Sequence, residues 1–173
     1  LSALNRCLVL DPNDTEAEER AANLVKGMLG VVIQRKTKVF WSGDSEETQK
    51  VYEFPNDIYL QDKGFDLEYH TGRGEQPIRN GVILYPLVQR YAITGDENAL
   101  DLAIGYANFL LGPSRYFSYN MEYYGHVHSA LWVASGLVML GRVTNDKYYV
   151  EKGKQIYDYT RSMTSDFGWV PEY

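Results

Sequence analysis

Paired carboxylates are the residues whose type and spacing could perform chemistry most directly. Asp66 and Glu68 alternate with Leu67 and Tyr69, so both carboxylates would face the same way on an extended segment. Hydrolysis of a glycosidic bond needs such a pair, one group acting as acid and the other as base or nucleophile. Nearby aromatic rings favour a raised pKa in one of them. We predict Asp66, Glu68 and Glu122 as catalytic, with solvated loop carboxylates as the alternative.

The histidines form a second set of candidates. His126 and His128 are two positions apart; on a helix they would point about 200° apart, whereas on an extended segment they would share a face. With Glu122 or His70 they could complete a metal site. In the alternative, one caps a helix and the other lines a polar cleft. Because no second ligand pair occurs at helical spacing, we predict no metal and no cofactor. We assign His126 to catalysis and His70 and His128 to substrate binding.

Aromatic residues point to carbohydrate as the substrate class. Fifteen tyrosines are present, and many fall outside the helical stripes. The C–H groups of a sugar face stack on aromatic rings, while hydroxyl, guanidinium and amide groups take the sugar hydroxyls. The predicted substrate-binding residues of this kind are Tyr123, Tyr124, Trp169, Arg73 and Arg79. By contrast, Tyr149, Tyr157 and Tyr159 fall on a predicted helix, where packing between helices is the expected role.

Helical hairpins would position these residues. Apolar residues recur at helical spacing in 17–32, 83–91, 100–111 and 130–138, and a further helix covers 149–163. Thr15 and Glu18 form a capping box before the first stripe, and residues 1–9 would be one more helix paired with 17–34. Thr94 and Thr144 are 50 positions apart, and Asp96 and Asp146 keep the same offset. The short Thr-x-Asp turns predict antiparallel pairs, about three in all, in an all-α fold.

Two connections break the helical pattern. Residues 39–80 are rich in aromatic residues and glycine, and residues 114–124 are similarly aromatic. Long connections in a compact domain tend to be functional. We therefore expect a single domain over 1–173, with a rigid helical scaffold that presents a binding face from its connections.

Charge and composition exclude several classes of function. The net charge of −6 and a pI near 5.1 argue against a nucleic-acid partner; the one basic group, 35–38, would close a helix and complement its dipole. A single cysteine, Cys7, excludes an internal disulfide and a multi-thiolate zinc site. We expect no membrane-spanning stretch. Both ends look cut, so we expect a longer parent chain and leave the localisation open.

The unit 91–103, with its Thr94-Gly95-Asp96 turn, resembles the repeat of the six-hairpin glycosidase superfamily, whose members are toroids of alternating inner and outer helices. The segments 125–130 and 167–172 are similar to a group of bacterial members related to beta-L-arabinofuranosidases. The resemblance covers about 77–173 and implies a partial α/α toroid that acts on carbohydrate. Two features depart from it: a ring of six hairpins needs about twice this length, and no residue matches the cysteine nucleophile and zinc site of the arabinofuranosidases.

The sequence leaves three functions open. A glycoside hydrolase-like domain using carboxylate acid/base catalysis is the first. The second is a non-catalytic scaffold, because 3–23 looks like a tetratricopeptide repeat boundary, although the downstream spacing of 50 differs from the roughly 34 of that repeat. The third is a toroid that epimerises sugars or cleaves polysaccharides by elimination, with histidine and tyrosine as proton carriers.

Overall fold

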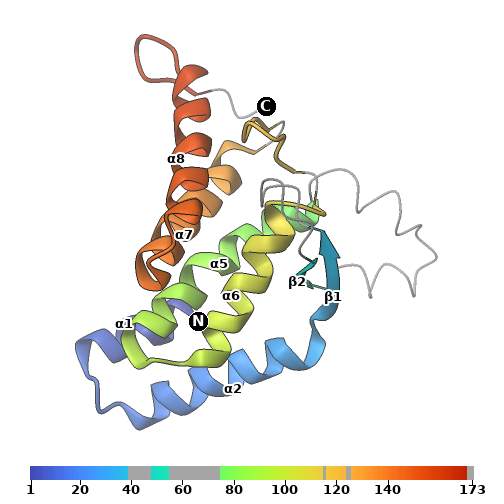
Figure 1. The fold of residues 1–173 in the computed structure, drawn as a ribbon. Helices are drawn as coiled ribbons and strands as arrows, with labels where there is room; N and C mark the ends of the chain where they lie inside the picture. The colour runs from blue at the N-terminus through green and yellow to red at the C-terminus, as the bar shows by residue number, and fades with distance from the viewer. Residues whose placement is uncertain (39–47, 55–74, 115, 124–125, 171–173) are drawn as a thin grey trace, which may run out of the picture.

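The computed structural model describes residues 1–38, 48–54, 75–114, 116–123 and 126–170. Along these ranges the elements are α1 (Ser2–Leu10), α2 (Thr15–Val31), β1 (Ile33–Lys38), β2 (Thr48–Glu53), α5 (Glu75–Thr94), α6 (Glu97–Leu110), α7 (Val127–Thr144) and α8 (Lys147–Ser162). Helices α1 and α2, α5 and α6, and α7 and α8 form three antiparallel hairpins (Figure 1). The mainly helical fold predicted from the sequence is confirmed.

The two repeated turns have the same local structure. Thr94 Oγ1 donates to the carbonyl of Arg90 at 2.9 Å, and Thr144 Oγ1 donates to that of Leu140 at 2.8 Å. The next residue is left-handed in both turns, with φ of 73° at Gly95 and 54° at Asn145. Glycine and asparagine tolerate this conformation best. Asp96 and Asp146 then cap the following helices through their side chains, as the sequence predicts.

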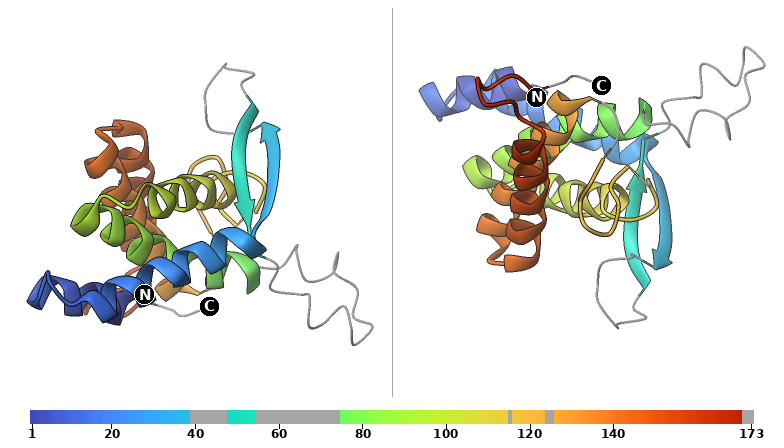
Figure 2. Two further views of the ribbon diagram at one scale, coloured as in Figure 1. Left: turned by 90° about the horizontal axis from the view of Figure 1, so that it is seen from below. Right: turned by 90° about the horizontal axis from the view of Figure 1, so that it is seen from above.

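Helix α5 is the centre of the arrangement. It packs against α1, α6 and α7, and its residues Leu84, Leu87 and Val88 are fully buried. Asn5, also fully buried, ties α1 to it by donating to the carbonyl of Pro86 at 2.9 Å. Helix α8 lies against α7, and the strands lie on the far side of α6 (Figures 1 and 2). The core is therefore formed mainly by α5, α6 and α7.

Arg90 joins three helices. Its side chain is only 2% exposed, and its two terminal nitrogens bond to the Glu18 carboxylate of α2. Its Nε donates to Asp96 Oδ2 at 3.2 Å, at the N-terminus of α6. A buried guanidinium requires such partners, because an unpaired buried charge is strongly destabilising. The hydrogen bonds from Arg90 also lower the pKa of Glu18.

The segment after α2 differs from the prediction. Helix α2 ends at Val31, where the sequence predicted a helix to 34, and the basic group 35–38 lies in β1. Ile33 pairs with Glu53 and Arg35 with Val51 in an antiparallel ladder. The run Val31-Val32-Ile33 explains the early end, since consecutive β-branched residues favour a strand over a helix.

Contacts with α6 hold this strand pair. Tyr52 donates to Asp101 Oδ2 at 2.6 Å, and Lys50 Nζ bonds to Asp101 Oδ1 at the same distance. The Tyr52 ring lies so close to Gly105 that a Cβ on this glycine would be 2.0 Å from the ring. Burial raises the pKa of Tyr52, so its hydroxyl stays protonated and serves as a donor. The hairpin thus covers one face of α6.

The structure also corrects the predicted N-terminus of α2 and the predicted extent of the connection 39–80. The N-cap of α2 is Asp14, which accepts from the backbone N–H of Ala17 at 2.9 Å, so Thr15 does not form the predicted capping box, and Glu18 binds Arg90. The predicted connection 39–80 contains β2 and the beginning of α5. The composition of residues 75–80 predicted a loop because it includes Pro77. Proline is tolerated in the first turn of a helix, so α5 can begin before it.

Helix α7 is apolar and 18 residues long. By length and composition it is the one described helix that could cross a membrane, in contrast to the sequence expectation. Half of it is buried inside the fold, against α5 and α8. Core helices of globular folds have the same character, so this helix by itself is weak evidence for a membrane span.

Candidate functional site

One face of α7 is left uncovered by its neighbours. The positions His128, Trp132, Ser135, Met139 and Arg142 recur at spacings of three and four and are exposed or half-buried. Residues at these spacings lie on one side of a helix. The opposite side of α7 carries fully buried residues such as Ala130, Val133 and Leu137. The exposed stripe runs about 21 Å along the helix at 1.5 Å per residue.

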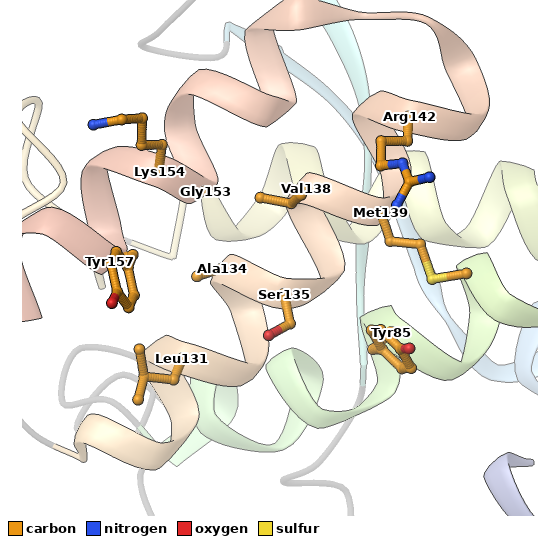
Figure 3. A pocket seen from close by; sticks show the side chains of 10 residues that line it. All are labelled: Tyr85, Leu131, Ala134, Ser135, Val138, Met139, Arg142, Gly153, Lys154 and Tyr157. Atoms are coloured by element: carbon orange, nitrogen blue, oxygen red, sulfur yellow. The ribbon is translucent and has the colours of Figure 1, made fainter.

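A groove of about 730 Å³ lies along this face, between α5, α7 and α8 (Figure 3). This volume falls within the roughly 300–1,000 Å³ of small-molecule sites. Ten residues line it: Tyr85, Leu131, Ala134, Ser135, Val138, Met139, Arg142, Gly153, Lys154 and Tyr157. We refer to it as the α5–α7–α8 groove and regard it as the candidate functional site.

The side chains in the groove have a definite order. At one end stand Lys154 and Tyr157, and at the other stand Arg142 and Tyr85 (Figure 3). Lys154 and Tyr157 are three positions apart on α8 and therefore share a face. Between the two ends lie Ala134, Ser135 and Val138. Each end of the groove thus combines one tyrosine with one cation.

Small residues form the floor. A Cβ on Gly153 would be 2.7 Å from the carbonyl oxygen of Ala134 and 2.8 Å from Val138 Cγ2. Helices α7 and α8 can approach closely only because position 153 has no side chain. The same contact fixes the groove's depth, since α8 cannot carry a larger residue here without moving away from α7.

Aromatic rings are accessible at the rim. Tyr157 is 54% exposed and Trp132 is 46% exposed. The rings of Tyr85 and Trp132 meet edge to face, with centroids 6.4 Å apart and an interplanar angle of 71°. Edge-to-face contacts of this kind orient both rings. Large exposed rings next to a groove are features of a binding surface.

Both charged residues of the groove are cations. Lys154 forms an ion pair with Asp158 one turn further along α8. In the part of the chain that the structure describes, no carboxylate pairs with Arg142. The whole chain has a net charge of −6. The groove is therefore a positive site on a negative protein.

Several sequence-predicted site residues lie outside the described residues: Asp66, Glu68, His70, Arg73 and Tyr124. Arg79 lies in the first part of α5, where only the backbone is described. Their predicted roles stay predictions. Glu122 is exposed, and its backbone N–H donates to Ser118 Oγ at 3.1 Å within the loop before α7.

Tyr123 is part of an aromatic cluster in that loop. It is 3% exposed, and its hydroxyl lies 2.7 Å from Thr160 Oγ1 of α8. Its ring contacts those of Tyr116, Phe117 and Tyr159. Tyr116, Phe117 and Tyr123 therefore extend the core, and the burial of Tyr123 indicates a packing role for its ring. A sugar-stacking role would need an accessible ring.

The two histidines lie at the beginning of α7. His126 is the N-cap residue, and its carbonyl accepts from the Tyr116 hydroxyl at 3.1 Å. His128 is the second helical residue and is exposed. Helical spacing from Val127 onward favours different directions for their side chains. Among the described residues, no group of three or more His, Cys, Asp and Glu could hold a metal ion.

Trp169 lies in the turn after α8. It is 60% exposed, and its backbone N–H donates to Ser165 Oγ at 2.9 Å while its carbonyl accepts from the Ser165 N–H at 2.8 Å. Its ring does not line the α5–α7–α8 groove. Trp169 and the groove are therefore separate candidates for sugar stacking, and a mutation can distinguish them.

The sequence does not predict the groove. Periodicity predicts packing for Tyr157, although half of that side chain is exposed, and no motif selects Tyr85, Ser135, Arg142 or Lys154. A usable signal is present in α7, where Ser135 and Arg142 interrupt the apolar run 130–143 at a spacing of seven. His128 continues the same stripe, which places one predicted residue on the groove's face of α7.

Comparison with known proteins gives no relative: no family model, no curated protein and no solved structure matches this chain.

Proposed function

We propose that this protein is carbohydrate-active and that it binds a saccharide in the α5–α7–α8 groove. The observation that supports this most strongly is that each end of an open groove carries one tyrosine and one cation, with Tyr157 exposed and Tyr85 half-buried. Tyrosine rings stack on the C–H faces of sugars, and guanidinium, ammonium and hydroxyl groups bond to sugar oxygens.

The composition of the groove suits an amphipathic ligand of this kind. Leu131, Ala134 and Val138 offer an apolar floor, and Ser135 places a hydroxyl between the two ends. A sugar ring has apolar faces and a polar edge, so it can meet both at once. The elongated stripe on α7 favours an oligosaccharide over a single sugar.

The reaction is a second part of the proposal. Three antiparallel hairpins are half of a six-hairpin toroid, and the proposed hydrolysis of a glycosidic bond rests on the resemblance to the six-hairpin glycosidases. Asp66 and Glu68 are its proposed acid and base or nucleophile. Substituting either by its amide should abolish the release of reducing sugar while saccharide binding persists. Loss of binding together with activity would contradict their catalytic role.

The binding proposal is tested by titration calorimetry with a panel of oligosaccharides. We expect Tyr157→Ala to weaken binding about two- to tenfold, because one stacking contact is worth roughly 0.5–1.5 kcal/mol. Trp169→Ala removes an exposed ring outside the groove and should leave the affinity unchanged. If Trp169→Ala weakens binding and Tyr157→Ala does not, the groove is not the sugar site.

A peptide-binding scaffold is the second candidate, favoured by the apolar floor of the groove. An amphipathic helix could lay its apolar face on Leu131 and Val138. The same titration distinguishes the two functions, since a scaffold would bind no saccharide in the panel.

A further inference from the structure

We infer that the α5–α7–α8 groove selects acidic oligosaccharides, whose carboxylates pair with Arg142 and Lys154. The inference rests on the proposed saccharide binding and adds the chemical class of the ligand. Its basis is the sign and the placement of the charges that line the groove.

Acidic side chains are excluded from the lining. Arg142 and Lys154 are its charged members, and none of the ten lining residues is an aspartate or glutamate. This arrangement runs against the composition, because the whole chain has 23 acidic and 17 basic residues. A groove for neutral sugars has no need of this bias, since carboxylates and amides accept hydrogen bonds from sugar hydroxyls equally well.

Arg142 is the stronger of the two anion sites. It lies in the last turn of α7, where its charge already complements the helix dipole. Its side chain also lines the groove, and among the described residues it has no carboxylate partner. The planar guanidinium fork fits a carboxylate through two parallel hydrogen bonds. A uronate carboxylate would therefore find an unoccupied donor pair at this end.

Lys154 has a partner that a ligand can replace. It pairs with Asp158, and the two side chains are 71% and 48% exposed. Exposed pairs of this kind contribute about 0–1 kcal/mol. A ligand carboxylate in the groove can therefore share the ammonium or replace Asp158 at little cost. Asp158 itself does not line the groove.

The two cations occupy opposite ends of the groove, and each of these ends also carries a tyrosine (Figure 3). One subsite of this pattern would hold a sugar ring against Tyr157 with its carboxylate at Lys154. The other would hold a ring against Tyr85 with its carboxylate at Arg142. The repetition favours a chain that carries an acidic group on more than one sugar.

The test is titration of the intact chain with an oligogalacturonate and with its methyl ester of the same length. We expect the acid to bind at least tenfold more tightly than the ester and to lose affinity as salt increases. Arg142→Gln should weaken acid binding about tenfold and ester binding much less, so that the preference for the acid falls. Lys26→Gln removes an exposed lysine of α2 and is the matched control for loss of one positive charge.

The outcomes separate the inference from the proposed function. If acid and ester bind equally and Arg142→Gln changes neither, the preference for acidic sugars is wrong while saccharide binding stands. If neither binds and no neutral oligosaccharide binds, the proposed function fails. A sulfated oligosaccharide that binds where the oligogalacturonate does not would overturn the assignment of the carboxylate. Circular dichroism of each variant confirms that the fold is intact.

Discussion

The guanidinium of Arg90 binds the carboxylate of Glu18 through both of its terminal nitrogens, and so joins α5 to α2 across 72 positions of sequence. Its Nε reaches Asp96 at the beginning of α6. One buried cation therefore connects the first hairpin to both helices of the second. Together with the hydrogen bond from Asn5 to the Pro86 carbonyl, this connection holds the first hairpin against the second.

Substituting Glu18 by glutamine should make the fold less stable and less sensitive to acid. Arg90 lowers the pKa of Glu18 below its ordinary value of 4.5. The ionised carboxylate therefore stabilises the fold above that pH, and this contribution is lost as the pH falls through the lower pKa of the folded state. We expect Glu18→Gln to cost about 1 kcal/mol at pH 7, because the carboxylate is partly exposed.

Urea unfolding at pH 7 and below pH 4.5 measures this difference. Glu16→Gln is the control, since Glu16 pairs with Arg20 in an exposed i,i+4 contact worth about 0.5 kcal/mol or less. An equal loss of stability in the two variants at pH 7 would show that the Glu18–Arg90 pair has no special role.

The two repeated turns should respond unequally to loss of their caps. Asp146→Ala removes an N-cap and should cost about 1 kcal/mol. Asp96→Ala removes the equivalent cap and also the bond from Arg90 Nε, so we expect about 2–3 kcal/mol. Denaturant midpoints at constant slope give both values. Equal costs would indicate that Asp96 acts only as a cap.

Adding one methyl group at Gly153 should destabilise the fold and alter the groove. The new Cβ would be 2.7 Å from the Ala134 carbonyl oxygen, so α8 must move away from α7 at a cost of about 1–3 kcal/mol. Gly27→Ala in α2 is the control, because nothing lies within 4 Å of its Cβ position. That change should be neutral or stabilise by up to about 1 kcal/mol. The temperature of thermal unfolding should therefore fall in Gly153→Ala and stay the same or rise in Gly27→Ala.

Local chemistry explains which parts of the fold the sequence could predict. The turn and cap hydrogen bonds of Thr94, Asp96, Thr144 and Asp146 join groups within four residues of each other, so the sequence could predict these turns. The strand pair depends on Ile33 meeting Glu53 and on Tyr52 meeting Gly105. Contacts across such distances leave no periodic pattern, and the segment was predicted as a helix end and a connection.

The groove could not be predicted from the sequence for a related reason. Tyr85, Ser135 and Tyr157 come from three different helices, and periodicity within one helix does not tell which stripe a neighbour covers. Tyr149 and Tyr157 show the difficulty. Both sit on α8, yet Tyr149 is buried with its hydroxyl 3.2 Å from Asn108 Oδ1, whereas Tyr157 is half exposed.

Fluorescence of Trp132 tests saccharide binding in the groove most directly, because its ring contacts Tyr85 at the rim. The chain has three tryptophans, so a variant with Trp41→Phe and Trp169→Phe leaves Trp132 as the reporter. We predict that an oligosaccharide changes this emission saturably and that Tyr157→Ala lowers the affinity read from this change about two- to tenfold. A saccharide that binds by calorimetry without changing Trp132 emission, or with the same affinity after Tyr157→Ala, would contradict the account.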